Sequence, residues 1–172
     1  MVTARGEYDA EARTYTLRLS QETPPTADQD EKLPLLIPVQ TGLLSPQGRV
    51  VDLETDDAFR TEAGSAMLLL DEAEKQFVFR NVPEAPVPSL LRGFSAPVKL
   101  ECDYSESELA LLLTHDSDSF NRWEASQLLG KRAILANAER YGRGESMQLS
   151  DGLIDAFGAL ISDAQADPAL LA

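Results

Sequence analysis

The chain has 172 residues, of which 43% are hydrophobic, enough for one domain with its own core or for one domain and the start of a second. Its 29 acidic and 15 basic residues give a formal net charge of -14, with 18 acidic and 10 basic residues up to Tyr104 and 11 and 5 after it. Both halves would repel phosphate backbones and anionic headgroups, so nucleic acid and membrane surfaces are poor candidates for partners.

The first hundred residues contain short segments in which apolar and polar side chains alternate, separated by turn residues. Tyr15, Leu17 and Leu19, for example, face one way while Thr16 and Arg18 face the other, as in a half-buried strand. Because no helical pattern separates the segments, an antiparallel immunoglobulin-like sandwich is favoured over a parallel sheet. The predicted strands are 2–8, 14–20, 35–43, 49–54, 66–71, 76–82 and 98–104, and the predicted core side chains are Tyr15, Leu17, Leu19, Phe77, Phe79, Val98 and Leu100.

Three features of this region lead to more specific predictions. Pro38 has no N–H, so strand 35–43 is expected at a sheet edge or with a bulge at that point. Residues 23–32 and 82–89 are rich in proline and polar side chains and are predicted to be surface connections. Cys102 alternates with Leu100 and Tyr104, which favours a buried thiol over a catalytic nucleophile.

The periodicity changes from 2 to 3.6 at Ser105, where Ser105 and Glu108 have capping-box spacing and an apolar stripe follows. A second, longer helix is predicted over 120–141, ending at Gly142 or Gly144. It is apolar on opposite sides and therefore needs neighbours on both, as in stacked helical repeats. The stripe of the first helix is Leu109, Leu112 and Leu113; the two faces of the second are Phe120, Trp123, Ile134, Leu135, Ala138 and Tyr141 on one side and Ala125, Leu129, Ala133 and Ala136 on the other.

A third helix is predicted to begin at Ser150, with Asp151 near its positive end. Its inward-facing side chains are expected to be Leu153, Ile154, Phe157, Leu160 and Ile161. Asp167 and Pro168 then have the spacing of a new helix start, shortly before Leu170 and Leu171. This pattern indicates a sequence cut from a longer protein, so the domains are predicted as a sandwich over 1–104 and the first helices of a truncated helical-repeat domain over 105–172.

No set of residues with a recognisable catalytic or metal-binding spacing is present, so no catalytic, cofactor-binding or metal-ligating residue is predicted. The single histidine, His115, cannot form a two-histidine zinc site or serve a nucleophile elbow. The acidic groups 28–31, 56–57 and 116–118 are interpreted as solvated loops or helix caps, because Phe120 and Asn121 break the calcium-loop pattern that begins at Asp116. Trp123 is expected to lie in the core.

Three further absences bear on location. No stretch approaches the ~20 apolar residues of a membrane-spanning helix, and the first residues lack the apolar region of a signal peptide. One cysteine cannot form an intramolecular disulfide. A cytoplasmic origin is therefore favoured.

Three strings of sequence resemble bacterial aminopeptidase N, a family of zinc-dependent metallopeptidases, in the region downstream of the catalytic domain. They are YTLRLSQETPPT with KLPLLIPV (15–39), FVFRNV with PVPSLLRGFSAPVKLE (77–101) and SFNRWEASQLL (119–129). The resemblance implies a β-sandwich followed by a large domain of stacked helices. Leu36 departs from the family, which often has histidine there.

The catalytic parts of that family lie upstream of the matching region. They are a G-A-M-E-N segment, an H-E-x-x-H zinc motif with a further glutamate, and a tyrosine; neither motif occurs here, and no residue of this chain is matched to the glutamate or the tyrosine. The resemblance therefore implies zinc and peptide substrates only for a parent protein, whose catalytic and C-terminal helical domains would be this chain's partners.

Three functions compete on this basis. The first is a structural spacer that places the helical domain relative to the catalytic domain. The second is a free-standing immunoglobulin-like interaction module, which would need an exposed aromatic patch. The third is an independent acidic hydrolase, which the lack of histidines opposes. We therefore expect no enzyme activity from this chain alone, whereas substrate preference, oligomeric state and the surfaces that meet other domains are not indicated by the sequence.

Overall fold

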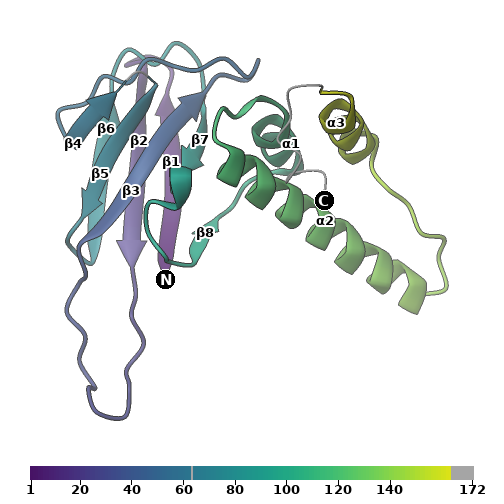
Figure 1. Cartoon of the computed structure of the whole chain (residues 1–172), viewed down its shortest axis with the longest axis horizontal. Helices are drawn as coiled ribbons and strands as arrows, with labels where there is room; N and C mark the ends of the chain where they lie inside the picture. The colour runs from purple at the N-terminus through teal and green to yellow at the C-terminus, as the bar shows by residue number, and fades with distance from the viewer. Residues whose placement is uncertain (63, 164–172) are drawn as a thin grey trace. The chain divides into compact units, whose positions relative to one another are not determined.

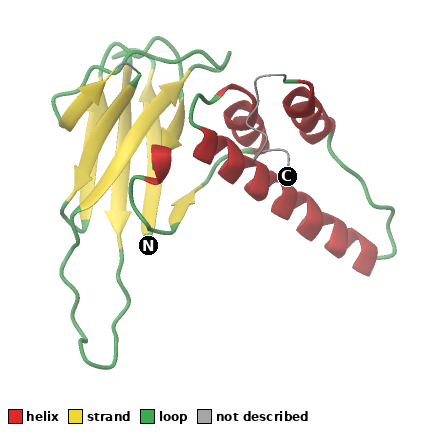
Figure 2. Ribbon diagram, in the orientation of Figure 1, coloured by secondary structure: helices red, strands yellow, loops and turns green. Residues whose placement is uncertain are grey.

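A computed structural model describes residues 1–62 and 64–163, which divide into a unit of strands, Met1–Asp103, and a unit of helices from Tyr104 onward (Figures 1 and 2). We call them the β-unit and the helical unit. The β-unit has two four-stranded sheets, in the orders β6-β2-β1-β8 and β4-β5-β3-β7. The strands are β1 (Val2–Asp9), β2 (Thr14–Gln21), β3 (Ile37–Leu44), β4 (Ala58–Glu62), β5 (Ser65–Leu70), β6 (Glu74–Phe79), β7 (Val87–Leu90) and β8 (Leu100–Cys102).

The two sheets share one core, to which β2 and β5 contribute every second side chain. From the first sheet, Leu17, Leu19, Phe77 and Phe79 are fully buried. Tyr15 is buried beside them, and Val98 and Leu100 are partly buried against the same core, so the predicted set of core residues is confirmed. Cys102 also packs against the core but is only half-buried.

The predicted Ig-like fold of antiparallel sheets is confirmed, and one strand pair is an exception. Neighbouring strands run antiparallel except β1 and β8, whose parallel register joins Val2 to Leu100 and Ala4 to Cys102. β8 is shorter than the predicted strand 98–104 because it is an edge strand that pairs with β1 alone.

One predicted strand is absent, and two strands were not predicted. Residues 49–54 form no strand; Val51 donates its N–H to the Leu43 carbonyl at 2.9 Å, and only isolated bridges flank it. Conversely, β7 lies in the segment predicted as a surface connection, and all four of its residues are buried. The two prolines suggested a loop, but β7 is an edge strand, where the missing N–H of Pro88 is tolerated. β4 was not predicted at all.

The prediction for Pro38 holds only locally. β3 lies between β5 and β7, so it is not an edge strand, but β7 pairs with it only from Thr41 onward. Beside Pro38 the second side of β3 meets Ser95, whose Oγ donates to the Pro38 carbonyl at 3.1 Å and accepts the Gln40 N–H at 3.0 Å. Beside Pro38, which has no N–H, the Ser95 hydroxyl thus makes the hydrogen bonds that a neighbouring strand would otherwise make.

The helical unit contains α1 (Glu106–His115), α2 (Ser119–Gly142) and α3 (Asp151–Ser162). Ser105 caps α1 through the predicted capping box, with Glu108 N–H to Ser105 Oγ at 3.2 Å and Ser105 N–H to Glu108 Oε2 at 2.7 Å. α1 packs against both other helices. The buried apolar side chains of the three helices are Leu109, Leu112 and Leu113 of α1, Ala125 and Leu129 of α2, and Ala156 and Leu160 of α3.

α3 buries a narrower stripe than predicted. Ala156 and Leu160 are buried, whereas Ile154 and Ile161 are 52% and 71% exposed. Among the described residues α3 packs mainly against α1, which covers side chains at three- and four-residue spacing and leaves the adjacent face open. The expected helix start at Asp167, with Leu170 and Leu171, lies outside the described residues.

Candidate interaction surface on the helical unit

One face of α2 is apolar and exposed. Ile134, Leu135 and Tyr141 are 71%, 54% and 75% exposed, although the opposite face buries Ala125 and Leu129. The sequence predicted two apolar faces. The described part of the chain buries Ala125 and Leu129 of one face, although Ala136 of that face is exposed, and leaves the other face largely exposed. We call the exposed one the outer face of α2.

Trp123 lies near the start of α2 and is 43% exposed, so the expectation that it lies in the core was wrong. Its ring is 6.0 Å from that of Phe120, centroid to centroid, in a tilted arrangement. The sequence placed both rings on the side of α2 that also carries Ile134. That side lacks a covering helix among the described residues, which explains the exposure.

The C-terminal half of α2 and the segment after it form an apolar groove of about 550 Å³. Met147 and Leu149 supply the side opposite the helix and are 70% and 56% exposed. The groove is lined by Ala133, Ile134, Asn137, Ala138, Tyr141, Met147, Gln148 and Leu149. With so few polar groups, it is suited to an apolar side chain or helix face and offers no reacting group.

Hydrogen bonds hold the far side of the groove in place. The Asn137 side chain pairs with the backbone of Gln148: Nδ2 donates to the Gln148 carbonyl at 2.8 Å, and Oδ1 accepts the Gln148 N–H at 2.7 Å. Arg140 Nε donates to the Ser146 carbonyl at 2.8 Å. The groove is therefore formed before any partner binds, which lowers the entropy cost of binding.

Charged side chains mark the turn at the end of α2. Arg143 Nε lies 2.7 Å from Glu145 Oε1, and this hydrogen bond lowers the pKa of Glu145 below its usual value, with a smaller effect from the charge of Arg140. Both side chains are largely exposed, so the pair adds little to stability. Its effect is to keep charge at the end of α2, next to the apolar groove.

Replacing Asn137 by alanine is expected to release residues 146–149 from α2, because both hydrogen bonds to Gln148 are lost. A net cost of about 1–2 kcal/mol is expected from typical values for such bonds. Hydrogen exchange of the Gln148 amide should accelerate, whereas Gln127→Ala, at an exposed position of the same helix, should leave it unchanged. Unchanged protection in Asn137→Ala would show that the clamp is not needed.

The histidine considered for catalysis lies at the exposed end of α1. His115 is in the last turn of α1, where a positive charge would interact favourably with the helix dipole. It borders a second cavity, of about 450 Å³, with Arg122, Asp155 and Asp163. Arg122 Nη2 lies 3.3 Å from Asp163 Oδ2, and its Nε donates to the Leu113 carbonyl at 2.9 Å, so this arginine links the three helices. In residues 1–62 and 64–163, no three His, Cys, Asp or Glu side chains lie close enough to hold a metal ion.

Two of the three acidic groups singled out in the sequence cap a helix or bind neighbouring groups of the chain. Asp118 caps α2 by accepting the Asn121 N–H at 2.9 Å, and Asp116 accepts the Asp118 N–H at the same distance. Asp56 forms an ion pair with Arg80 at 2.7 Å, whereas Asp57 accepts the Val78 N–H at 3.1 Å. The third group, Asp28, Asp30 and Glu31, is exposed in the connection between β2 and β3.

The sequence did not identify the groove, although it identified the outer face of α2. Met147 and Leu149 lie in a segment without periodicity, and the pairing of Asn137 with Gln148 spans eleven residues. The only available signal was the pair of apolar residues between Gly144 and the Ser150 cap. No helix among the described residues is long and apolar enough to cross a membrane.

Comparison with known proteins gives the same division. Residues 1–103 match the family described as "Domain of unknown function (DUF3458) Ig-like fold", and residues 106–172 match the one described as "Domain of unknown function (DUF3458_C) ARM repeats". Aminopeptidase N of Escherichia coli (strain K12) is 41% identical over 172 residues, covering 100% of this chain and 19% of the relative. Aminopeptidase N of Haemophilus influenzae is 36% identical over 160 residues, covering 93% and 18%.

A solved structure extends the likeness to three dimensions. The crystal structure of Legionella pneumophila aminopeptidase A in complex with aspartic acid has a TM-score of 0.75 at 28% identity, covering 99% of this chain and 17% of that one. The chain thus spans about a fifth of the length of its curated relatives. It belongs to the DUF3458 family of Ig-like domains with adjoining ARM repeats, and it matches the C-terminal region of aminopeptidase N.

Proposed function

We propose that this chain is a non-catalytic structural part of a zinc-dependent aminopeptidase, and that it fixes the position of further helices relative to the rest of that protein. The observation that carries the proposal is the exposed apolar outer face of α2, in a chain that matches only 19% of the length of its relative. ARM repeats bury such faces by stacking each helical unit on the next. The outer face and groove of α2 are suited to receive that next unit.

The activity and substrates of the parent protein are part of the same proposal. The relatives are aminopeptidases by name, and the resemblance implies a zinc ion and peptide substrates in a catalytic domain elsewhere in the polypeptide. We place no catalytic, cofactor-binding or metal-ligating residue in this chain. We also propose a domain boundary between Tyr104 and Ser105 and a cytoplasmic location for the parent.

The isolated chain is expected to bind no stoichiometric zinc and to cleave no aminoacyl arylamide. The reason is that its single histidine cannot form the two-histidine ligand set of such a zinc site. Metal analysis after dialysis and a hydrolysis assay with added zinc would check this. The parent protein, assayed alongside, is the positive control. Turnover by the isolated chain would contradict the proposal.

The structural role is tested by hydrogen exchange on this chain and on the parent protein. Amides of α2 are expected to be less protected than those of β2 and β6 in this chain, because α2 is covered on one side only. In the parent they should become as protected as the strands. If α2 is equally protected in both proteins, no helix packs on its outer face and the proposal is wrong.

A free-standing interaction module is the other candidate. In its favour, Phe59 and Phe94 of the β-unit are 74% and 53% exposed, although the composition suggested that aromatic side chains lie mostly in the core. The match of the whole chain to one segment of a longer protein favours the structural role.

A further inference from the structure

A second apolar surface lies on the β-unit, far along the sequence from α2. The connection between β2 and β3, residues 22–36, extends past the ends of the strands (Figure 1). Near its end, Leu33, Leu35 and Leu36 are 83%, 55% and 66% exposed. Single exposed leucines are common on protein surfaces, but three in four residues form a contiguous apolar segment. We call it the leucine segment.

The backbone of the leucine segment is held in place. Gln21, the last residue of β2, accepts the Leu35 N–H with its Oε1 at 2.8 Å, and its Nε2 donates to the Leu35 carbonyl at 2.8 Å and to the Glu72 carbonyl at 2.9 Å. This is the same pairing of a side-chain amide with a backbone peptide that Asn137 makes beside the groove of α2. A segment fixed in this way loses little entropy when a partner binds to it.

The tip of the connection is also ordered, and it is acidic. Thr26 and Gln29 exchange two backbone hydrogen bonds of 3.1 and 3.0 Å, and Lys32 Nζ donates to both of their side chains at 2.8 and 2.9 Å. Lys32 is thus held by neutral oxygens. The acidic residues of the tip are Asp28, Asp30 and Glu31; all are exposed, and within the described residues none forms an ion pair.

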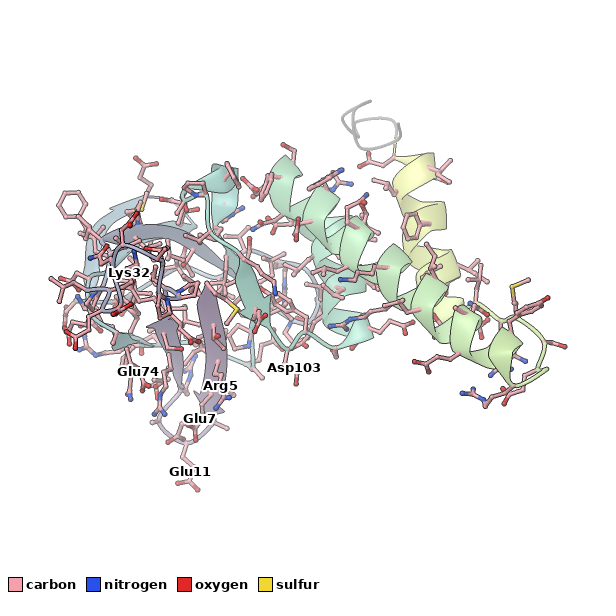
Figure 3. All side chains as sticks on the ribbon, turned by 90° about the horizontal axis from the view of Figure 1, so that it is seen from below. Arg5, Glu7, Glu11, Lys32, Glu74 and Asp103 are labelled. Carbon is pink, nitrogen blue, oxygen red and sulfur yellow. The ribbon has the colours of Figure 1, made fainter. Side chains whose placement is uncertain are left out.

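The outer face of the sheet β6-β2-β1-β8, in contrast, carries charged side chains. Arg5, Glu7 and Glu74 lie on that face (Figure 3), and Arg18 Nε lies 3.5 Å from Glu74 Oε1. These side chains are exposed to solvent, and Arg18 and Glu74 are also paired, so this face gains little from a partner. Of the two surfaces, the leucine segment is the one that gains free energy from being covered.

We propose that the leucine segment docks onto another domain of the same polypeptide, at an apolar surface bordered by lysine or arginine. This inference rests on the proposed function, since it requires a longer parent. About four fifths of the length of the E. coli relative lies outside the matched region, which covers 19% of it, so such a domain has ample sequence to be drawn from. The basic border follows from the three acidic residues beside the leucines. A second copy of this chain fits poorly, because it would bring two acidic tips together in a chain of net charge -14.

Oxidative footprinting by hydroxyl radicals, read by mass spectrometry, tests the proposal on the isolated chain and on the parent protein. Oxidation of Leu33, Leu35 and Leu36 is expected to be severalfold slower in the parent. Leu17 and Leu19, fully buried in the β-unit, should be oxidised equally slowly in both and serve as internal controls. Equal oxidation of the leucine segment in both proteins would overturn the inference.

Further outcomes separate the possible occupants. Slow oxidation in the isolated chain, together with a dimer in sedimentation, would identify a second copy and overturn the proposal. In the parent, replacing Asp30 and Glu31 by lysine should restore much of the oxidation, whereas Glu11→Lys, on the connection between β1 and β2, should not. If charge reversal has no effect, the basic border is wrong.

The two proposals fail separately. If the leucine segment is oxidised equally in both proteins while α2 is more protected in the parent, only this inference fails. If α2 is equally protected in both proteins, the proposed structural role fails.

Discussion

Replacing Phe77 by alanine is expected to lower the free energy of unfolding of the β-unit by about 3–5 kcal/mol, the typical cost of removing a buried phenylalanine. Phe77 is completely buried, in register with Leu17 on the neighbouring strand β2. Its ring fills the space between the two sheets, so the cavity left by alanine lies in the centre of the core. A loss of this size is a large part of the 5–15 kcal/mol that holds most domains folded.

Urea unfolding, monitored by hydrogen exchange of the β2 amides, measures this effect within the β-unit alone. Phe59→Ala is the matched control, because Phe59 is 74% exposed on β4 and its removal should change stability by less than about 0.5 kcal/mol. Similar effects from the two substitutions would show that the core is not packed as described.

Leu113→Ala is expected to have the second largest effect, about 2–5 kcal/mol on the helical unit. Leu113 is fully buried on α1, the helix that packs against both α2 and α3. The described core of this unit holds few large side chains, so the loss should leave it largely unfolded. Fluorescence of Trp123, the single tryptophan, reports on this unit.

Leu135→Ala is the matched control for Leu113→Ala. Leu135 is 54% exposed on the outer face of α2, so its truncation should change the stability of this chain by less than about 0.5 kcal/mol. In the parent protein, where we propose that another helix covers this face, the same substitution should cost more. Equal, small effects in both proteins would indicate that Leu135 is never covered.

Side-chain periodicity predicted the parts of the structure that bury one clear face. Leu17 alternates with the polar residues Thr16 and Arg18, and Ser105 and Glu108 form a capping box, so local patterns were sufficient for these elements. β7 was missed because all four of its residues are buried, which removes the alternation, and because Pro88 suggests a loop. Whether proline is tolerated depends on a strand's place in the sheet, which no local pattern contains.

Of the candidate surfaces, one could be predicted from local periodicity and two depend on contacts between residues distant in sequence. The outer face of α2 was predicted because a helix repeats its faces every few residues. The groove beside it and the leucine segment depend on Asn137 pairing with Gln148 and on Gln21 pairing with Leu35, eleven and fourteen residues away. Neither glutamine nor asparagine is distinctive in composition, so these pairings could be found only in the structure.

The pairing of β1 with β8 sets an order of events during synthesis. β1 is made before β8, yet one of its edges is completed by residues 100–102. At typical rates of 5–20 residues per second, roughly 5–20 s separate the two strands. Throughout that interval β1 can pair with β2, but its other edge stays open to any extended chain nearby. The nascent protein is therefore exposed to wrong pairing along this edge until residues 100–102 have been made, and a chaperone that shields the edge would act in that interval.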